Sequence, residues 1–168
     1  MENQRINRTK KTKLSEFNLE EIRGWIIDQM NNIESQINFI IRDYFNPEKM
    51  SEFNKIILNS SIISIGGKLK ILRNIKSFDN KMIDKIQKIS SIRNAFAHLP
   101  ITENIQLTFK RDVNGNIKSS EVAKIISQIE IMNSNGELKL KNTQELITFF
   151  FELNTEIRQY LLSVQKHN

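Results

Sequence analysis

Arg93 and His98 are the two residues of this chain whose types and spacing are best suited to chemistry. They lie in the phrase Arg93-Asn94-Ala95-Phe96-Ala97-His98, and the whole sequence has only 2 histidines. A guanidinium stabilises a charged phosphate, and an imidazole gives or takes a proton near neutral pH. Together these groups are sufficient, in principle, to cleave RNA without a metal ion. The same residue types also serve as a helix cap and an ion-pair partner, so the spacing alone leaves both interpretations open.

A helical wheel places Arg93 where an apolar residue is expected. At about 100° per residue, it falls near the middle of an apolar stripe that includes Ile86 and Phe96, whereas Asn94 and His98 stack on the flank. Burying a guanidinium without a partner costs several kcal/mol. We therefore expect either a carboxylate from another helix beside Arg93, or a cleft or subunit interface at this end of the helix.

Four helices are predicted from the spacing of the apolar residues. Their expected bounds are Asn18 to Phe45, 51 to 75, Asp79 or Asn80 to His98, and Thr143, as the cap, to Val164. The first ends before Pro47 and the third before Pro100, because the residue that precedes a proline disfavours helical backbone. Gly66-Gly67 interrupts the second helix, which indicates either a local break or a close contact with another helix.

The segment between the third and fourth helices changes period and predicts strands. Residues 104–110 alternate polar and apolar, Asn114-Gly115 marks a turn, and residues 125–132 and 137–141 supply two more strands around Asn135-Gly136. The predicted fold class is mainly α, a four-helix bundle with a small antiparallel β insert at about 104–141 between the third and fourth helices. Residues 15–168 are expected to form one domain after a basic flexible tail, residues 1–14.

Composition argues against several classes of protein. There is no cysteine, and one of the 2 histidines is the penultimate residue, so neither a disulfide framework nor a metal site is expected. No apolar run approaches the roughly 20 residues of a membrane span, and the N-terminus lacks the apolar core of a signal peptide. We expect a soluble, cytoplasmic protein that uses no cofactor.

The charge of the chain favours an anionic partner. The formal net charge is +6 and the pI is about 9.5. Part of the excess lies near the N-terminus, in Arg5, Arg8, Lys10, Lys11 and Lys13. These side chains are either a solvated tail or an electrostatic arm that binds RNA phosphates.

The full phrase from Ile92 to His98 is more specific than the Arg–His spacing. It closely resembles the Arg-x4-6-His motif of the HEPN superfamily, in which a polar residue often follows the arginine, and Asn94 fits that position. The segment from Gly66 to Leu72 is similar to the second-helix segment of HEPN relatives near the mannitol operon repressor family. The resemblance covers roughly residues 18–100, the last helix agrees in kind, and the β insert lies outside the general pattern.

This resemblance implies a metal-independent endoribonuclease in which the motifs of a homodimer meet in one composite site. His98 would take the proton of a ribose 2′-OH or protonate the leaving 5′ oxygen, Arg93 would bind the scissile phosphate, and Asn94 would orient either of them. Many relatives are toxins or antiphage effectors, which implies an RNA substrate and an antitoxin or other regulatory partner. The alternatives are a non-catalytic HEPN-like module that binds a protein, nucleotide or nucleic acid, and an unrelated helical adaptor.

Overall fold

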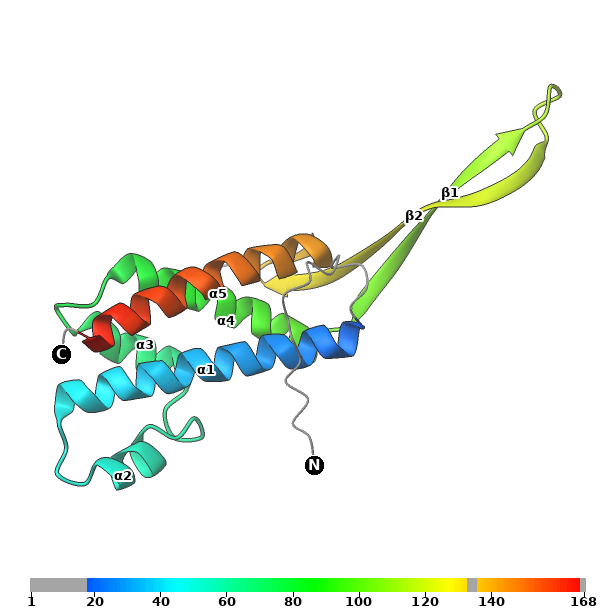
Figure 1. The fold of residues 1–168 in the computed structure, drawn as a ribbon. Helices are drawn as coiled ribbons and strands as arrows, with labels where there is room; N and C mark the ends of the chain where they lie inside the picture. Colours follow the sequence, from blue (N-terminus) through cyan, green and yellow to red (C-terminus); the bar gives the residue numbers. More distant parts are fainter. Residues whose placement is uncertain (1–17, 133–135, 167–168) are drawn as a thin grey trace, which may run out of the picture.

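Packed helices form an elongated body, and a long β hairpin extends from one end of it (Figure 1). The computed structural model describes residues 18–132 and 136–166. The elements are α1 (Leu19–Phe45), α2 (Met50–Glu52), the π-helical turn η2 (Phe53–Ile57), α3 (Ile65–Arg73), α4 (Asn80–His98), β1 (Ile101–Arg111), β2 (Ile117–Met132), β3 (Leu138–Asn142) and α5 (Thr143–Lys166). The body consists of α1, α3, α4 and α5, and we call residues 103–127 of the hairpin the arm.

The predicted fold class, a mainly α four-helix bundle with a small β insert, is wrong. The described residues form a mixed α/β structure in which five α-helices are combined with a three-stranded antiparallel sheet of order β1-β2-β3. β2 has 16 residues, which corresponds to about 50 Å of extended chain. The first half of β2 shows little apolar alternation, so the sequence pattern missed it. This half belongs to the strand because it pairs with β1, up to Ile117 of β2, which lies opposite Arg111.

Side-chain caps begin α1 and α4, and both helices end shortly before a proline, as predicted. The Asn18 side chain accepts a hydrogen bond from the backbone N–H of Glu20 at 3.2 Å, and α1 ends at Phe45, before its C-cap Asn46, whose φ of 42° is left-handed. The Asp79 side chain accepts from the backbone N–H of Lys81 at 2.8 Å, and α4 ends at His98. The predicted bounds of both helices are confirmed.

The helix expected over 51–75 is divided into α2, η2 and α3. The break lies at 58–64 rather than at Gly66-Gly67, which belong to the first turn of α3 after its cap, Ser64. A Cβ on Gly67 would lie 2.8 Å from Cγ2 of Ile63, so Ile63 would have to move for any larger residue there. The close contact at the glycines therefore exists, but it is made with the preceding loop rather than with another helix.

Each turn of the sheet contains a glycine with left-handed backbone, whereas the cap of the last helix differs from the prediction. Gly115 and Gly136 have φ of 83° and 80°, the left-handed region that such turns require, and Asn135 lies outside the described residues. α5 begins at Thr143, but its cap is Asn142, whose Oδ1 accepts the backbone N–H of Gln144 at 2.8 Å. Thr143 is therefore the first helical residue and not the cap.

The core lies along the facing sides of α1, α3, α4 and α5. Its fully buried side chains include Ile26, Ile33, Leu72, Ile83, Phe96 and Phe150. Ile129 of β2 is also fully buried in this core, so the base of the hairpin is attached to the body. No helix in the described ranges is both long enough and apolar enough to cross a membrane.

Candidate functional site

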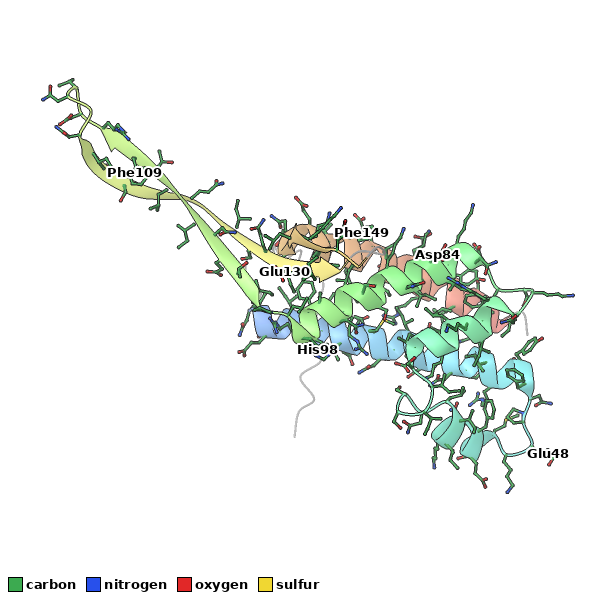
Figure 2. All side chains as sticks on the ribbon, turned by 180° about the vertical axis from the view of Figure 1, so that it is seen from behind. Glu48, Asp84, His98, Phe109, Glu130 and Phe149 are labelled. Atoms are coloured by element: carbon green, nitrogen blue, oxygen red, sulfur yellow. The ribbon has the colours of Figure 1, made fainter. Side chains whose placement is uncertain are left out.

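Arg93, Asn94 and His98 lie in the last two turns of α4, at the end of the body from which β1 leaves. Arg93 is half-buried, and Nη1 of its guanidinium donates a hydrogen bond to Oδ1 of Asn94 at 2.9 Å. Asn94 and His98 are exposed. The structure thus brings together two of the three predicted catalytic residues, and it places His98 at the free end of the same helix (Figure 2).

The side chain of His98 makes no hydrogen bond or ion pair with the residues that the structure describes. Five helical positions separate it from Arg93, which corresponds to about 7.5 Å along the axis and about 140° around it. The two side chains therefore flank the end of α4 and do not contact each other.

The guanidinium of Arg93 is not fully satisfied. Its Nε is buried and has no hydrogen-bond partner within the described part of the chain. The expected carboxylate from another helix is Glu34 of α1, whose pKa the charge of Arg93 helps to lower, but the two residues form no ion pair. A desolvated donor without a partner is costly, so Arg93 has hydrogen-bonding capacity that the described structure does not use.

Next to Arg93 lies a group of residues that we call the buried charge cluster, Glu34, Ser60 and Lys68. Oε1 of Glu34 accepts hydrogen bonds from Nζ of Lys68 at 2.5 Å and from Oγ of Ser60 at 2.7 Å. Lys68 is 0% exposed and Glu34 is 9% exposed. One buried ion pair connects α1 with α3, and the hydrogen bond from Ser60 attaches the loop between η2 and α3 to the same carboxylate.

The carboxyl of Glu34 is held in its ionised form. Burial raises its pKa, but the hydrogen bonds from Lys68 and Ser60 and the charges of Lys68 and Arg93 outweigh burial, and the pKa lies below its ordinary value of 4.5. Sequence reasoning did not find this cluster. The available signal was Glu34 among the isoleucines of α1, a charged residue on an apolar stripe, which is the same signal that singled out Arg93.

Arg23 of α1 is a further cation at this end of α4 that sequence reasoning missed. Its Nη2 donates a hydrogen bond at 3.0 Å to the carbonyl oxygen of Leu99, the residue after His98. The two residues are 76 positions apart, and the antiparallel packing of α1 and α4 brings them together (Figure 1). Arg23 and Arg93 are both partly exposed cations, so their charges favour an anion at this end of α4.

The two grooves that the described structure shows most clearly do not lie at the motif. Two grooves lie elsewhere, one at residues 47–57 and one between α1 and α5, which is lined by Trp25, Phe151 and Arg158 among others. Neither groove includes a residue of the motif. No group of three or more potential metal-ligating side chains gathers in the described ranges. The predicted RNA-binding residues Arg5, Arg8, Lys10, Lys11 and Lys13 lie outside the described residues.

No family model matches this chain, and no curated protein or solved structure compared with it shows a significant match. The HEPN resemblance therefore depends on the motif of α4 and on the glycine segment of α3. It stays a prediction.

Proposed function

We propose that the chain is a metal-independent endoribonuclease of the HEPN type, which cleaves single-stranded RNA in the cytoplasm as a toxin or antiphage (abortive-infection) effector. One observation carries the proposal. Arg93 is oriented by Asn94 and keeps a buried Nε without a partner in the described structure, five residues before the exposed and unbonded His98. An incompletely satisfied guanidinium near an imidazole without a partner matches what phosphodiester cleavage requires.

The chemistry assigns one role to each side chain. His98 takes the proton of a ribose 2′-OH, whose oxygen forms a bond to the adjacent phosphorus. The bond from phosphorus to the 5′ oxygen breaks, and this leaving oxygen takes a proton from a second acid, which is His98 of the other copy in a dimer. Arg93 stabilises the charge that develops on the phosphate oxygens. The products are a 2′,3′-cyclic phosphate and a 5′-hydroxyl, and DNA is spared because it lacks the 2′-OH.

A homodimer belongs to this proposal because one protomer does not complete the site. Arg93 and His98 diverge around α4, and neither of the two grooves described above includes them. A two-fold contact along the end of α4 brings two motifs into one cleft and supplies both an acid and a base. The five basic residues near the N-terminus then act as additional RNA-phosphate contacts, and an antitoxin or other regulatory protein remains an expected partner.

A substrate that differs by one oxygen tests the proposed reaction. The purified full chain is incubated in EDTA with a single-stranded RNA, and mass spectrometry identifies the cut and its ends. A matched oligonucleotide then carries a 2′-deoxy sugar only at the nucleotide 5′ to that cut. We expect cyclic phosphate ends on the first substrate and no cleavage at that position of the second. Equal cleavage of the deoxy substrate would disprove the mechanism.

A second candidate function is a non-catalytic HEPN-like binding module. The position of the two grooves described above favours it, since neither of them includes Arg93, Asn94 or His98. Arg93 and Asn94 would then bind the phosphate of a nucleic acid or nucleotide without cleaving it. This function predicts that RNA is bound and recovered intact, and that Arg93→Ala weakens the binding.

A further inference from the structure

The arm has one apolar face and one polar face along β1. Successive side chains of a strand point to opposite faces, so Ile105, Leu107 and Phe109 share one face while the even positions 104–110 share the other. The three apolar side chains are 58%, 48% and 48% exposed. Ile117 of β2, which pairs with Arg111, is on the same face and is 57% exposed. We call this surface the arm face.

Nothing in the described structure covers the arm face. β1 leaves the body after Pro100, and Phe109 lies far from every helix (Figure 2). An antiparallel sheet with one apolar and one polar face normally packs its apolar face against something. A two-stranded hairpin is only marginally stable alone in water. The arm therefore needs an occupant for this face.

The order of residues along the arm face is self-complementary about Leu107. Glu103 lies four residues before Leu107 and Arg111 lies four residues after it, with Ile105 and Phe109 at the intermediate positions. In two arm faces packed antiparallel on a two-fold axis through Leu107, each Glu103 meets the other copy's arginine and each Ile105 meets the other copy's phenylalanine. This arrangement pairs every charge with its opposite.

Both charged residues are available for such pairing. Neither Glu103 nor Arg111 forms an ion pair with the residues that the structure describes. Arg111 donates one hydrogen bond, from Nη1 to the carbonyl oxygen of Gly115 at 3.2 Å, which leaves its other donors for a carboxylate.

We propose that the arm is a homodimerisation element, in which the arm faces of two copies of this chain pack against each other. Four half-exposed apolar side chains and two charged ones offer on the order of 500 Å² per copy. The total, about 1,000 Å², is at the lower limit of a specific interface. A nucleic acid is a poorer occupant, because its phosphates gain nothing from an apolar surface on which one cation is balanced by one anion.

This contact is different from the composite RNA-cleaving site. Leu107 lies six residues from Ile101, where β1 leaves the body, so the two-fold axis is about 20 Å from each body. The motifs of the two copies are then about 40 Å apart, too far for one cleft. A chain that uses both contacts forms an assembly larger than a dimer. The arm proposal does not depend on ribonuclease activity.

Crosslinking tests the arm contact directly, because the chain has no cysteine of its own. We expect a short bis-maleimide reagent to link Leu107→Cys into a covalent dimer. The matched control is Thr108→Cys, the next residue on the same strand but on the polar face, which should stay unlinked. No dimer at position 107, or equal linking at both positions, would overturn the proposal.

Charge reversal supplies a second readout. Glu103→Arg and Arg111→Glu should each weaken self-association at least about tenfold in sedimentation experiments, because like charges then meet across the axis. The double variant restores the opposite charges and should recover association. Failure of the double variant to recover, with the fold intact by circular dichroism, contradicts the proposed register. RNA cleavage by Glu103→Arg should persist, so the arm contact and the ribonuclease function can each be disproved without the other.

Discussion

Two groups of polar residues lie side by side in this protein and differ in how completely they are satisfied. The buried charge cluster of Glu34, Ser60 and Lys68 closes on itself, with a fully buried ammonium, a carboxylate and a hydroxyl joined by short hydrogen bonds. The motif of α4 leaves the Nε of Arg93 without a partner in the described residues and His98 exposed. The comparison indicates that the first group maintains the fold and that the second remains available for a ligand.

The two groups should therefore contribute differently to the free energy of unfolding. Removing one partner of a buried ion pair leaves an uncompensated charge, which costs about 3–5 kcal/mol. Removing an exposed side chain without partners changes stability by no more than about 0.5 kcal/mol. Variants of the two groups should therefore differ strongly in their free energies of unfolding, although Arg93 lies beside the cluster.

Lys68→Ala should have the largest effect on stability. It leaves the Glu34 carboxylate buried without its cation, and we expect the free energy of unfolding to fall by about 3–5 kcal/mol in urea denaturation. Lys70→Ala is the matched control, because Lys70 is exposed on the same helix. A loss for Lys68→Ala no larger than that of the control would show that the cluster does not stabilise the fold.

Low pH should have the second-largest effect on stability, through the buried charge cluster. The folded-state pKa of Glu34 is lowered from 4.5, so its contribution to stability is complete above pH 4.5 and is lost as the pH falls through the lower, folded value. We expect the free energy of unfolding of the wild type to fall in this range, and that of Glu34→Gln to fall less. Glu152→Gln, at an exposed position of α5, should retain the wild-type slope. Equal slopes for all three proteins would contradict the ionised buried carboxylate.

Arg93→Ala should have a smaller effect on stability than Lys68→Ala. The guanidinium has a buried donor without a partner in the described structure, and it forms no ion pair with Glu34. We expect a change of less than about 1 kcal/mol in the free energy of unfolding, since weak charge contacts are worth that much. A loss as large as that of Lys68→Ala would assign Arg93 to the buried charge cluster instead of the site.

His98→Ala should have the smallest effect on stability. Its side chain is exposed at the end of α4, so the free energy of unfolding should stay within about 0.5 kcal/mol of the wild-type value. Thermal unfolding followed by circular dichroism is sufficient for this comparison. A clear loss of stability would show that the imidazole stabilises the end of the helix.

The parts of the structure that depend on local signals were predictable from the sequence. Asn18 and Asp79 determine where α1 and α4 begin, and the prolines that follow determine where they end, so both helices were predicted correctly. The unusual position of Arg93 was also visible on a helical wheel. The half-burial of this residue and its unpartnered Nε agree with that reading.

The parts that depend on contacts between distant residues were not predictable. The bond between Glu34 and Lys68 joins positions 34 residues apart, and the bond between Arg23 and Leu99 joins positions 76 apart. The first half of β2 depends on its pairing with β1 more than on its own pattern. The break at 58–64 has apolar residues at helical spacing, and only the packed structure shows that the helix stops there.

The most direct test of the central claim is RNA cleavage in EDTA by the wild type, Arg93→Ala, His98→Ala and a control, Lys88→Ala, an exposed cation on the same helix. We predict that the wild type and the control cleave single-stranded RNA at similar rates. Each of the two motif variants should be slower by about a thousandfold while remaining folded. Full activity in both motif variants would contradict the assignment of Arg93 and His98 as the residues that cleave RNA.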